Sequence, residues 1–85
     1  MSNKLEILKK RLIYRASYRG TKEMDILLST FVNKYIHEFD EILLIELEKF
    51  LNLEDEIILN YYNYNILDKN IEENKILKIF KKYKI

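Results

Sequence analysis

The sequence predicts an all-α protein, a single five-helix bundle that occupies residues 1–85 as one domain. Apolar residues recur three and four positions apart along most of the chain, which is the period of an amphipathic helix. Alternation of apolar and polar residues, the pattern of a strand, does not compete with this period over any useful length. A chain of this size buries only ~60–65% of its unfolded surface, so we expect a thin core.

The first helix is predicted from about Asn3 to near Tyr18, with Ser2 or Asn3 as its N-cap. Its apolar positions are Leu5, Leu8, Leu12 and Ala16. The only glycine of this proline-free chain, Gly20, follows it. A residue without a Cβ takes positive φ at little steric cost, so we predict that Gly20 is the C′ residue that ends this helix and redirects the chain.

Polar residues suited to N-caps precede the next two helices. Thr21 is the predicted cap of a helix that runs to about Ile36. Its apolar stripe consists of Met24, Leu27, Leu28, Phe31 and Tyr35. Asp40 is the predicted cap of the third helix, which ends at the polar stretch 52–55. The apolar face of the third helix consists of Leu43, Leu47, Phe50 and Leu51.

The last two helices are shorter. The fourth carries Ile57, Ile58 and Tyr61 inward, and the asparagine-rich run 60–65 spans its end and a loop, because asparagine favours turns over helix interiors. Asn70, with Glu73 three residues later, resembles a capping box and predicts the start of the fifth helix. One side of this helix presents Ile76, Ile79, Phe80 and Tyr83.

Composition excludes several classes of protein. The 48% hydrophobic and 34% charged residues suit a soluble globular protein, and the absence of cysteine excludes disulfides and zinc fingers. The longest apolar run, 42–45, is far too short to cross a bilayer. One glycine cannot build a phosphate-binding loop, so no cofactor is expected. Helical pattern from about Asn3 leaves no room for a cleavable leader, and we expect a cytoplasmic, bacterial protein.

Catalysis and metal binding are not expected. The only histidine, His37, lacks the ligand spacings of zinc and di-iron sites and is interpreted as a surface or helix-end residue. The acidic clusters 38–41 and 54–56 coincide with helix starts, and the lysines of residues 75–84 with a final helical turn. The helix dipole favours these placements, so the charges need no ligand to explain them.

Three arginines are the strongest candidates for binding. Arg11, Arg15 and Arg19 are each four residues apart, so they line one side of the first helix and lead into the Gly20 bend. This ridge is either a solvated face or a binding surface. One hypothesis is a nucleic-acid-binding or antitoxin-like regulator, against which the net charge of +1 speaks. A generic helical adaptor is another.

The stretch from Arg11 through Arg19-Gly20-Thr21-Lys22-Glu23-Met24-Asp25 to Phe31 resembles the succinate dehydrogenase flavinylation factor family, the SdhE-type FAD assembly factors. The resemblance covers roughly residues 10–83. It implies a five-helix protein, a monomer when free, that binds the flavoprotein subunit of succinate dehydrogenase and, in some bacteria, fumarate reductase. It also implies that the protein is an assembly chaperone, not an enzyme, which promotes covalent attachment of FAD to a histidine of that subunit. Because the chain has neither a ligand cluster nor a phosphate loop, we expect no tight complex of the isolated protein with FAD, and its charge balance predicts no nucleic acid as a partner.

Residues carry over from the family motif one by one. Arg19, Gly20 and Glu23 match it as partner-binding residues, Asp25 matches a commonly acidic position, and the predicted surface is extended by Arg15 and Arg11. Many members have arginine where this chain has Tyr18, and tryptophan where it has Tyr61. If Arg19 and Glu23 serve the partner, both are expected to be accessible in the free protein. The alternative is a local cap interaction within the loop.

Overall fold

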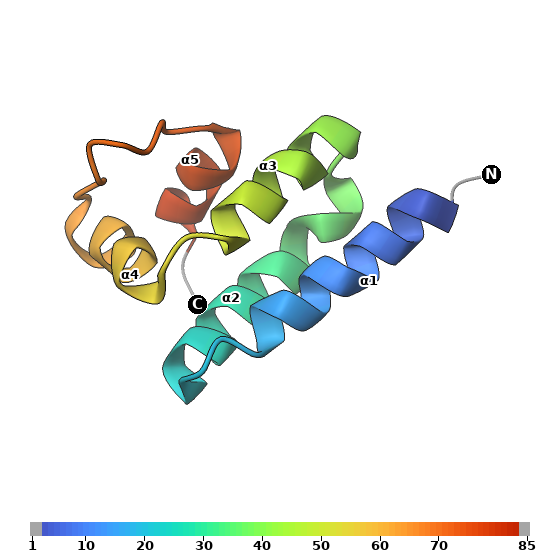
Figure 1. Ribbon diagram of the computed structural model, residues 1–85, viewed down its shortest axis with the longest axis horizontal. Coiled ribbons are helices and arrows are strands. Elements are labelled where there is room, and N and C mark those ends of the chain that lie inside the picture. The colour runs from blue at the N-terminus through green and yellow to red at the C-terminus, as the bar shows by residue number, and fades with distance from the viewer. Residues whose placement is uncertain (1–2, 84–85) are drawn as a thin grey trace.

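The computed structural model describes residues 3–83 and confirms the all-α prediction (Figure 1). Within this range there are no strands, and the helices are α1 (Asn3–Ser17), α2 (Lys22–Tyr35), the 3-10 helix η1 (Ile36–Glu38), α3 (Glu41–Leu51), α4 (Asp55–Tyr64) and α5 (Lys75–Lys82). Helix α1 packs along α2 and also contacts α3, and α3 packs on α5. Ser2, a predicted cap of α1, and Lys84 lie outside the described residues.

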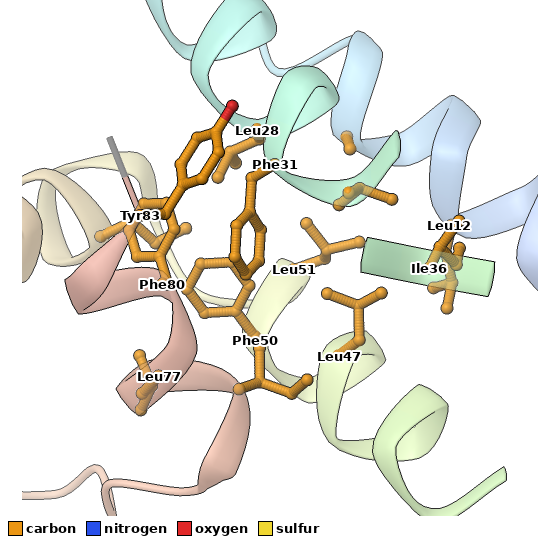
Figure 2. Close-up of a cluster of buried hydrophobic side chains, with 14 of the residues drawn as sticks. Leu12, Leu28, Phe31, Ile36, Leu47, Phe50, Leu51, Leu77, Phe80 and Tyr83 are labelled. Carbon is orange, nitrogen blue, oxygen red and sulfur yellow. The ribbon is translucent and has the colours of Figure 1, made fainter. Parts of the chain in front are cut away.

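The core is an apolar cluster in which aromatic rings join α2, α3 and α5 (Figure 2). The ring centroid of Phe31 lies 6.0 Å from that of Phe50, 5.0 Å from that of Phe80 and 5.4 Å from that of Tyr83, each in an edge-on arrangement. Such pairs add ~0.5–1.5 kcal/mol each beyond the area that they bury. Among residues 4–83, for which burial is described, no polar or charged residue is buried.

Two predicted caps are confirmed. Thr21 Oγ1 accepts a hydrogen bond from the Met24 amide over 3.3 Å, and Asp40 Oδ1 accepts one from the Leu43 amide over 2.9 Å. The buried face of α3 differs from the prediction by one position, because Leu44 is fully buried while Leu43 is only partly buried. Leu44, Leu47 and Leu51 share one face at helical spacing, and all three lie in the core.

The predicted start of the fifth helix is wrong. Helix α5 begins at Lys75, and Asn74 is its cap, accepting a hydrogen bond from the Leu77 amide over 2.9 Å. Asn70 lies in a turn, where its amide donates to Asp68 Oδ1 over 2.9 Å. This turn competes with helix initiation at Asn70.

Glu73, the predicted capping-box partner of Asn70, instead accepts a hydrogen bond from the Tyr61 hydroxyl. Helix α4 continues through most of the asparagine-rich run to Tyr64. It ends at Asn65, which takes a left-handed conformation with φ of 58°. Asparagine is the residue type, after glycine, that most readily adopts this conformation at a helix end.

Candidate functional site

The bend between α1 and α2 is built around Gly20, whose φ of +117° confirms the predicted positive value. Its position differs from the prediction: α1 ends at Ser17, so Gly20 is the third residue after the helix and not the C′ residue. A Cβ at Gly20 would meet no heavy atom within 4 Å. The glycine is therefore required by the backbone conformation and not by crowding.

The guanidinium of Arg19 turns inward to the junction between α3 and α4. Its Nε donates to Asp55 Oδ1 over 2.9 Å, and its Nη2 lies 2.8 Å from the same oxygen. Nη2 also donates to the Leu53 carbonyl over 2.7 Å, and Nη1 donates to the Leu51 carbonyl. The side chain is only 11% exposed. The prediction that Arg19 is accessible in the free protein is therefore wrong.

The chemistry of the junction explains this inward orientation. Leu51 is the last residue of α3, and the carbonyls of a final helical turn lack intrahelical donors and carry the negative end of the helix dipole. Asp55 adds a full negative charge in the first turn of α4. A guanidinium has five donors and no acceptor, so it satisfies several such acceptors at once.

Asp25 also acts inside the bend. Its carboxylate accepts a hydrogen bond from the backbone amide of Arg19, and its own amide donates to the Thr21 carbonyl over 2.9 Å. Asp25 thus joins the first turn of α2 to the residue before Gly20. The alternative of a cap interaction within the loop fits Asp25 and Arg19 but leaves out Glu23.

Glu23 is exposed, as predicted, and it has no ion-pair or hydrogen-bond partner among the residues that the structure describes. At the start of the bend, directly after α1, Tyr18 is 69% exposed and its ring centroid lies 4.6 Å from that of Tyr14, which is also exposed. This aromatic pair was not among the residues predicted from the sequence. The sequence pattern that indicates it is the spacing of four residues between Tyr14 and Tyr18, which brings their rings to the same side of the chain at the end of α1.

Arg11 and Arg15 face α3. Arg11 Nη2 lies 3.0 Å from Glu48 Oε2, Arg15 Nη1 lies 4.0 Å from the same oxygen, and Arg15 also donates to Asn52 Oδ1. Arg11 remains 58% exposed. Exposed pairs of this kind contribute ~0–1 kcal/mol, so they leave the arginines available for new partners at little cost.

A shallow pocket of about 520 Å³ lies between the end of α1 and the start of α4. Its lining is mostly charged and polar, and it includes Arg15, Tyr18, Glu54 and Glu56. Sites for small cofactors are mostly apolar. Across residues 3–83, no three potential metal-ligating side chains cluster together. None of the helices in the same range has both the length and the apolar composition of a membrane-spanning helix.

Two further predictions concern single residues. His37 is exposed in η1, which confirms its interpretation as a surface residue at a helix end. Tyr61 is 2% exposed. Burial, together with the hydrogen bond to Glu73, raises the pKa of Tyr61 above its ordinary value. A tyrosine in place of tryptophan at this position is therefore a change inside the core, and it can affect a partner only indirectly.

Two curated proteins that are similar to this chain in sequence have the same name as each other. The chain is 41% identical over 81 residues to succinate dehydrogenase assembly factor 2, mitochondrial, of Scheffersomyces stipitis, covering 88% of this chain and 53% of that protein. It is 37% identical over 84 residues to the protein of the same name from Lodderomyces elongisporus, covering 92% and 50%. The chain thus spans about half the length of these relatives. No solved structure matches it significantly.

These names contradict the predicted cytoplasmic, bacterial location, because the relatives are called mitochondrial and come from eukaryotes. A shorter match, 56% identical over 36 residues, is to succinate dehydrogenase assembly factor 2-A, mitochondrial, of Drosophila mojavensis, covering 42% of this chain and 23% of that protein. The prediction depended on where the chain begins. The first residue of a chain that spans about half of its relatives carries no information about a leader.

The family-level comparison covers nearly the whole chain. A family model described as "Flavinator of succinate dehydrogenase" matches residues 10–84. This range includes the Gly20 bend, the arginines of α1 and the junction that holds Arg19. The chain therefore belongs to the succinate dehydrogenase flavinator family.

Proposed function

We propose that this protein is an assembly factor that binds the flavoprotein subunit of succinate dehydrogenase and promotes covalent attachment of FAD to a histidine of that subunit. Membership of the flavinator family and the names of its relatives support the proposal. The observation that carries it furthest is Glu23, an exposed carboxylate that lacks a partner among residues 3–83 and projects from a bend fixed on its inner side by Arg19 and Asp25.

The proposed role is binding and orientation, not catalysis. Flavin bound in the partner would supply the electrophile: its methyl carbon loses a proton, the histidine nitrogen bonds to that carbon and loses its own proton, and the ring system takes up two electrons that an external electron acceptor later removes. An assembly factor then needs only to favour the geometry in which the two meet, and correct orientation alone lowers reaction barriers by up to ~7–11 kcal/mol. The bend suits close approach, because no side chain projects from Gly20 and the space around it is open. Glu23 would accept hydrogen bonds from a basic side chain of the partner.

Exposed aromatic rings extend this surface. Tyr14, in the last turn of α1, and Tyr18, directly after the helix, present adjacent exposed rings. Tyrosine is enriched in protein interfaces because it combines a large apolar area with a hydroxyl that remains hydrogen-bonded. Arg11 and Arg15, with their weak surface pairs, would add contacts to acidic groups of the partner.

The test is in-gel flavin fluorescence of the denatured flavoprotein subunit, which detects only covalent flavin. Cells that lack this gene should lose the signal, and the native gene should restore it. Glu23→Gln should restore ~10% or less, because removing a charge from a desolvated interface costs ~2–5 kcal/mol of binding.

The matched control is Glu41→Gln. Glu41 is also an exposed glutamate in the first turn of a helix. It lies at the start of α3, which follows the end of α2 opposite to the bend (Figure 1). This variant should restore the full signal. Equal restoration by both variants, or full covalent flavin in cells without the gene, would contradict the proposal.

Nucleic-acid binding by the arginine ridge is the alternative. The structure weakens it, since Arg19 is turned inward and its guanidinium is held by Asp55 and by backbone carbonyls. Binding to duplex DNA that weakens steeply with salt, as phosphate contacts require, would favour this alternative.

A further inference from the structure

We propose that Asp55 is a positioning residue for the partner-binding bend, an inference that builds on the function proposed above. Asp55 is 36 residues from Arg19 in sequence and belongs to α4, outside the motif of the bend. Its carboxylate is 29% exposed, so it is partly withdrawn from solvent while it holds the Arg19 guanidinium. Through this contact, the start of α4 determines the position that the Glu23 side chain takes on the surface of the bend.

The first step is the fixed orientation of Arg19. Asp55 Oδ1 faces Nε and Nη2 of the guanidinium, the Leu53 carbonyl accepts from Nη2, and the Leu51 carbonyl accepts from Nη1. A planar guanidinium with several directed donors is fixed in both place and tilt by such a set, whereas the ammonium of lysine would not be. Asp55 provides the only negative charge in this set, so it adds a Coulomb attraction to the guanidinium that the neutral carbonyls do not supply.

The second step transmits this orientation to the bend. The backbone amide of Arg19 donates to Asp25, which lies two residues after Glu23 in the first turn of α2. The Cβ direction of Gly20, between Arg19 and this turn, is open space, so packing there does not hold the bend. The contacts of Arg19 therefore tie the bend to α4 from its inner side, and Glu23 remains exposed on the outer side.

The experiment compares Asp55→Asn with Glu56→Gln, its neighbour in the first turn of α4. Both variants replace a carboxylate with an amide in the same helical turn, but Glu56 is exposed and has no partner among the described side chains. Binding of the purified protein to the flavoprotein subunit is measured well below each unfolding midpoint. We expect ~10-fold weaker binding for Asp55→Asn and a change within about twofold for Glu56→Gln.

Two further readouts separate positioning from a loss of stability. Asp55→Asn should shift the backbone amide NMR signals of residues 19–25 while those of core residues such as Phe31 stay in place. Binding by the double variant Arg19→Gln with Asp55→Asn should match that of Arg19→Gln alone within about twofold, because both changes break one contact. If Asp55→Asn fails to fold, Asp55→Glu, which keeps the charge, should fold and retain more than about half of the binding affinity.

Asp55→Asn with native affinity, or a double variant whose losses add, would overturn the positioning role while leaving the proposed function intact. The NMR comparison needs no partner and therefore tests the link from Asp55 to the bend independently. If the native protein does not bind the flavoprotein subunit at all, the proposed function fails, and this role fails with it. Shifted amide signals would in that case support only the structural link.

Discussion

Replacement of Arg19 with alanine should destabilise the free protein substantially. The change leaves the Asp55 carboxylate and the carbonyls of Leu51 and Leu53 without their donor. Breaking a fully buried ion pair costs ~3–5 kcal/mol, and an exposed pair contributes ~0–1 kcal/mol. With Arg19 at 11% and Asp55 at 29% exposure, and an open pocket that lets water reach the acceptors, we expect about 2–3 kcal/mol.

The loss should be visible in thermal and urea denaturation followed by circular dichroism. For a domain of this size, 1 kcal/mol corresponds to a shift in Tm of ~4–8 °C, so the expected decrease is about 10–20 °C. Arg11→Ala is the control: Arg11 is 58% exposed and pairs with Glu48 at the surface, so the cost should stay below about 1 kcal/mol. A Tm for Arg19→Ala within about 2 °C of the native value would show that Arg19 points outward in solution, as a direct partner contact would require.

Three further predictions can be tested on the free protein. Asn74→Ala should cost about 1 kcal/mol in urea denaturation because it removes the cap of α5, and Asn70→Ala should cost less than half as much; equal costs would contradict the assignment of the cap. The pKa of Tyr61 is raised in the folded protein, so the stability that this tyrosine contributes is fully present below its unfolded pKa of ~10 and is lost as the pH rises further. Tyr61→Phe should therefore flatten the decline of Tm between about pH 9 and 11. A decline of Tm as steep as that of the native protein would refute this. Gly20→Val should cost about 1–3 kcal/mol, since a β-branched residue is strongly disfavoured at φ of +117°, and native stability of the variant would show that the bend takes another conformation in solution.

Local features of the fold could be predicted because they depend on neighbours in sequence. Thr21 and Asp40 cap their helices through the amide three residues on, and the helical period identified most of the buried face. Asn70 and Asn74 both precede the apolar run of α5, and the choice between them depends on other contacts. The turn at Asp68 engages Asn70, and Tyr61 engages the glutamate that a capping box would need.

The candidate site was predicted less completely for the same physical reason. The expectation that Glu23 is accessible followed from its predicted role as a partner contact, and the side chain is exposed. The inward orientation of Arg19 depends on a carboxylate 36 residues away and on the end of α3, neither of which a local pattern can place nearby. Asp55 lies at a helix start, as the sequence predicts, but its carboxylate also pairs with Arg19, which no local pattern indicates.

A glycine can be required because a side chain would not fit or because the backbone takes a positive φ. The open space in the Cβ direction of Gly20 leaves only the second reason. Since no neighbour lies within 4 Å of a Cβ, the fold demands only a residue whose handedness permits φ of +117°. A D-amino acid meets that demand, because mirror-image residues prefer positive φ. D-alanine at position 20 of a chemically synthesised chain should therefore raise stability by ~0.4–1 kcal/mol by restricting the unfolded chain. Its methyl group takes the place of the α-hydrogen opposite the L Cβ direction, so a stable D-alanine chain beside a destabilised L-alanine chain would show that handedness alone is what position 20 demands.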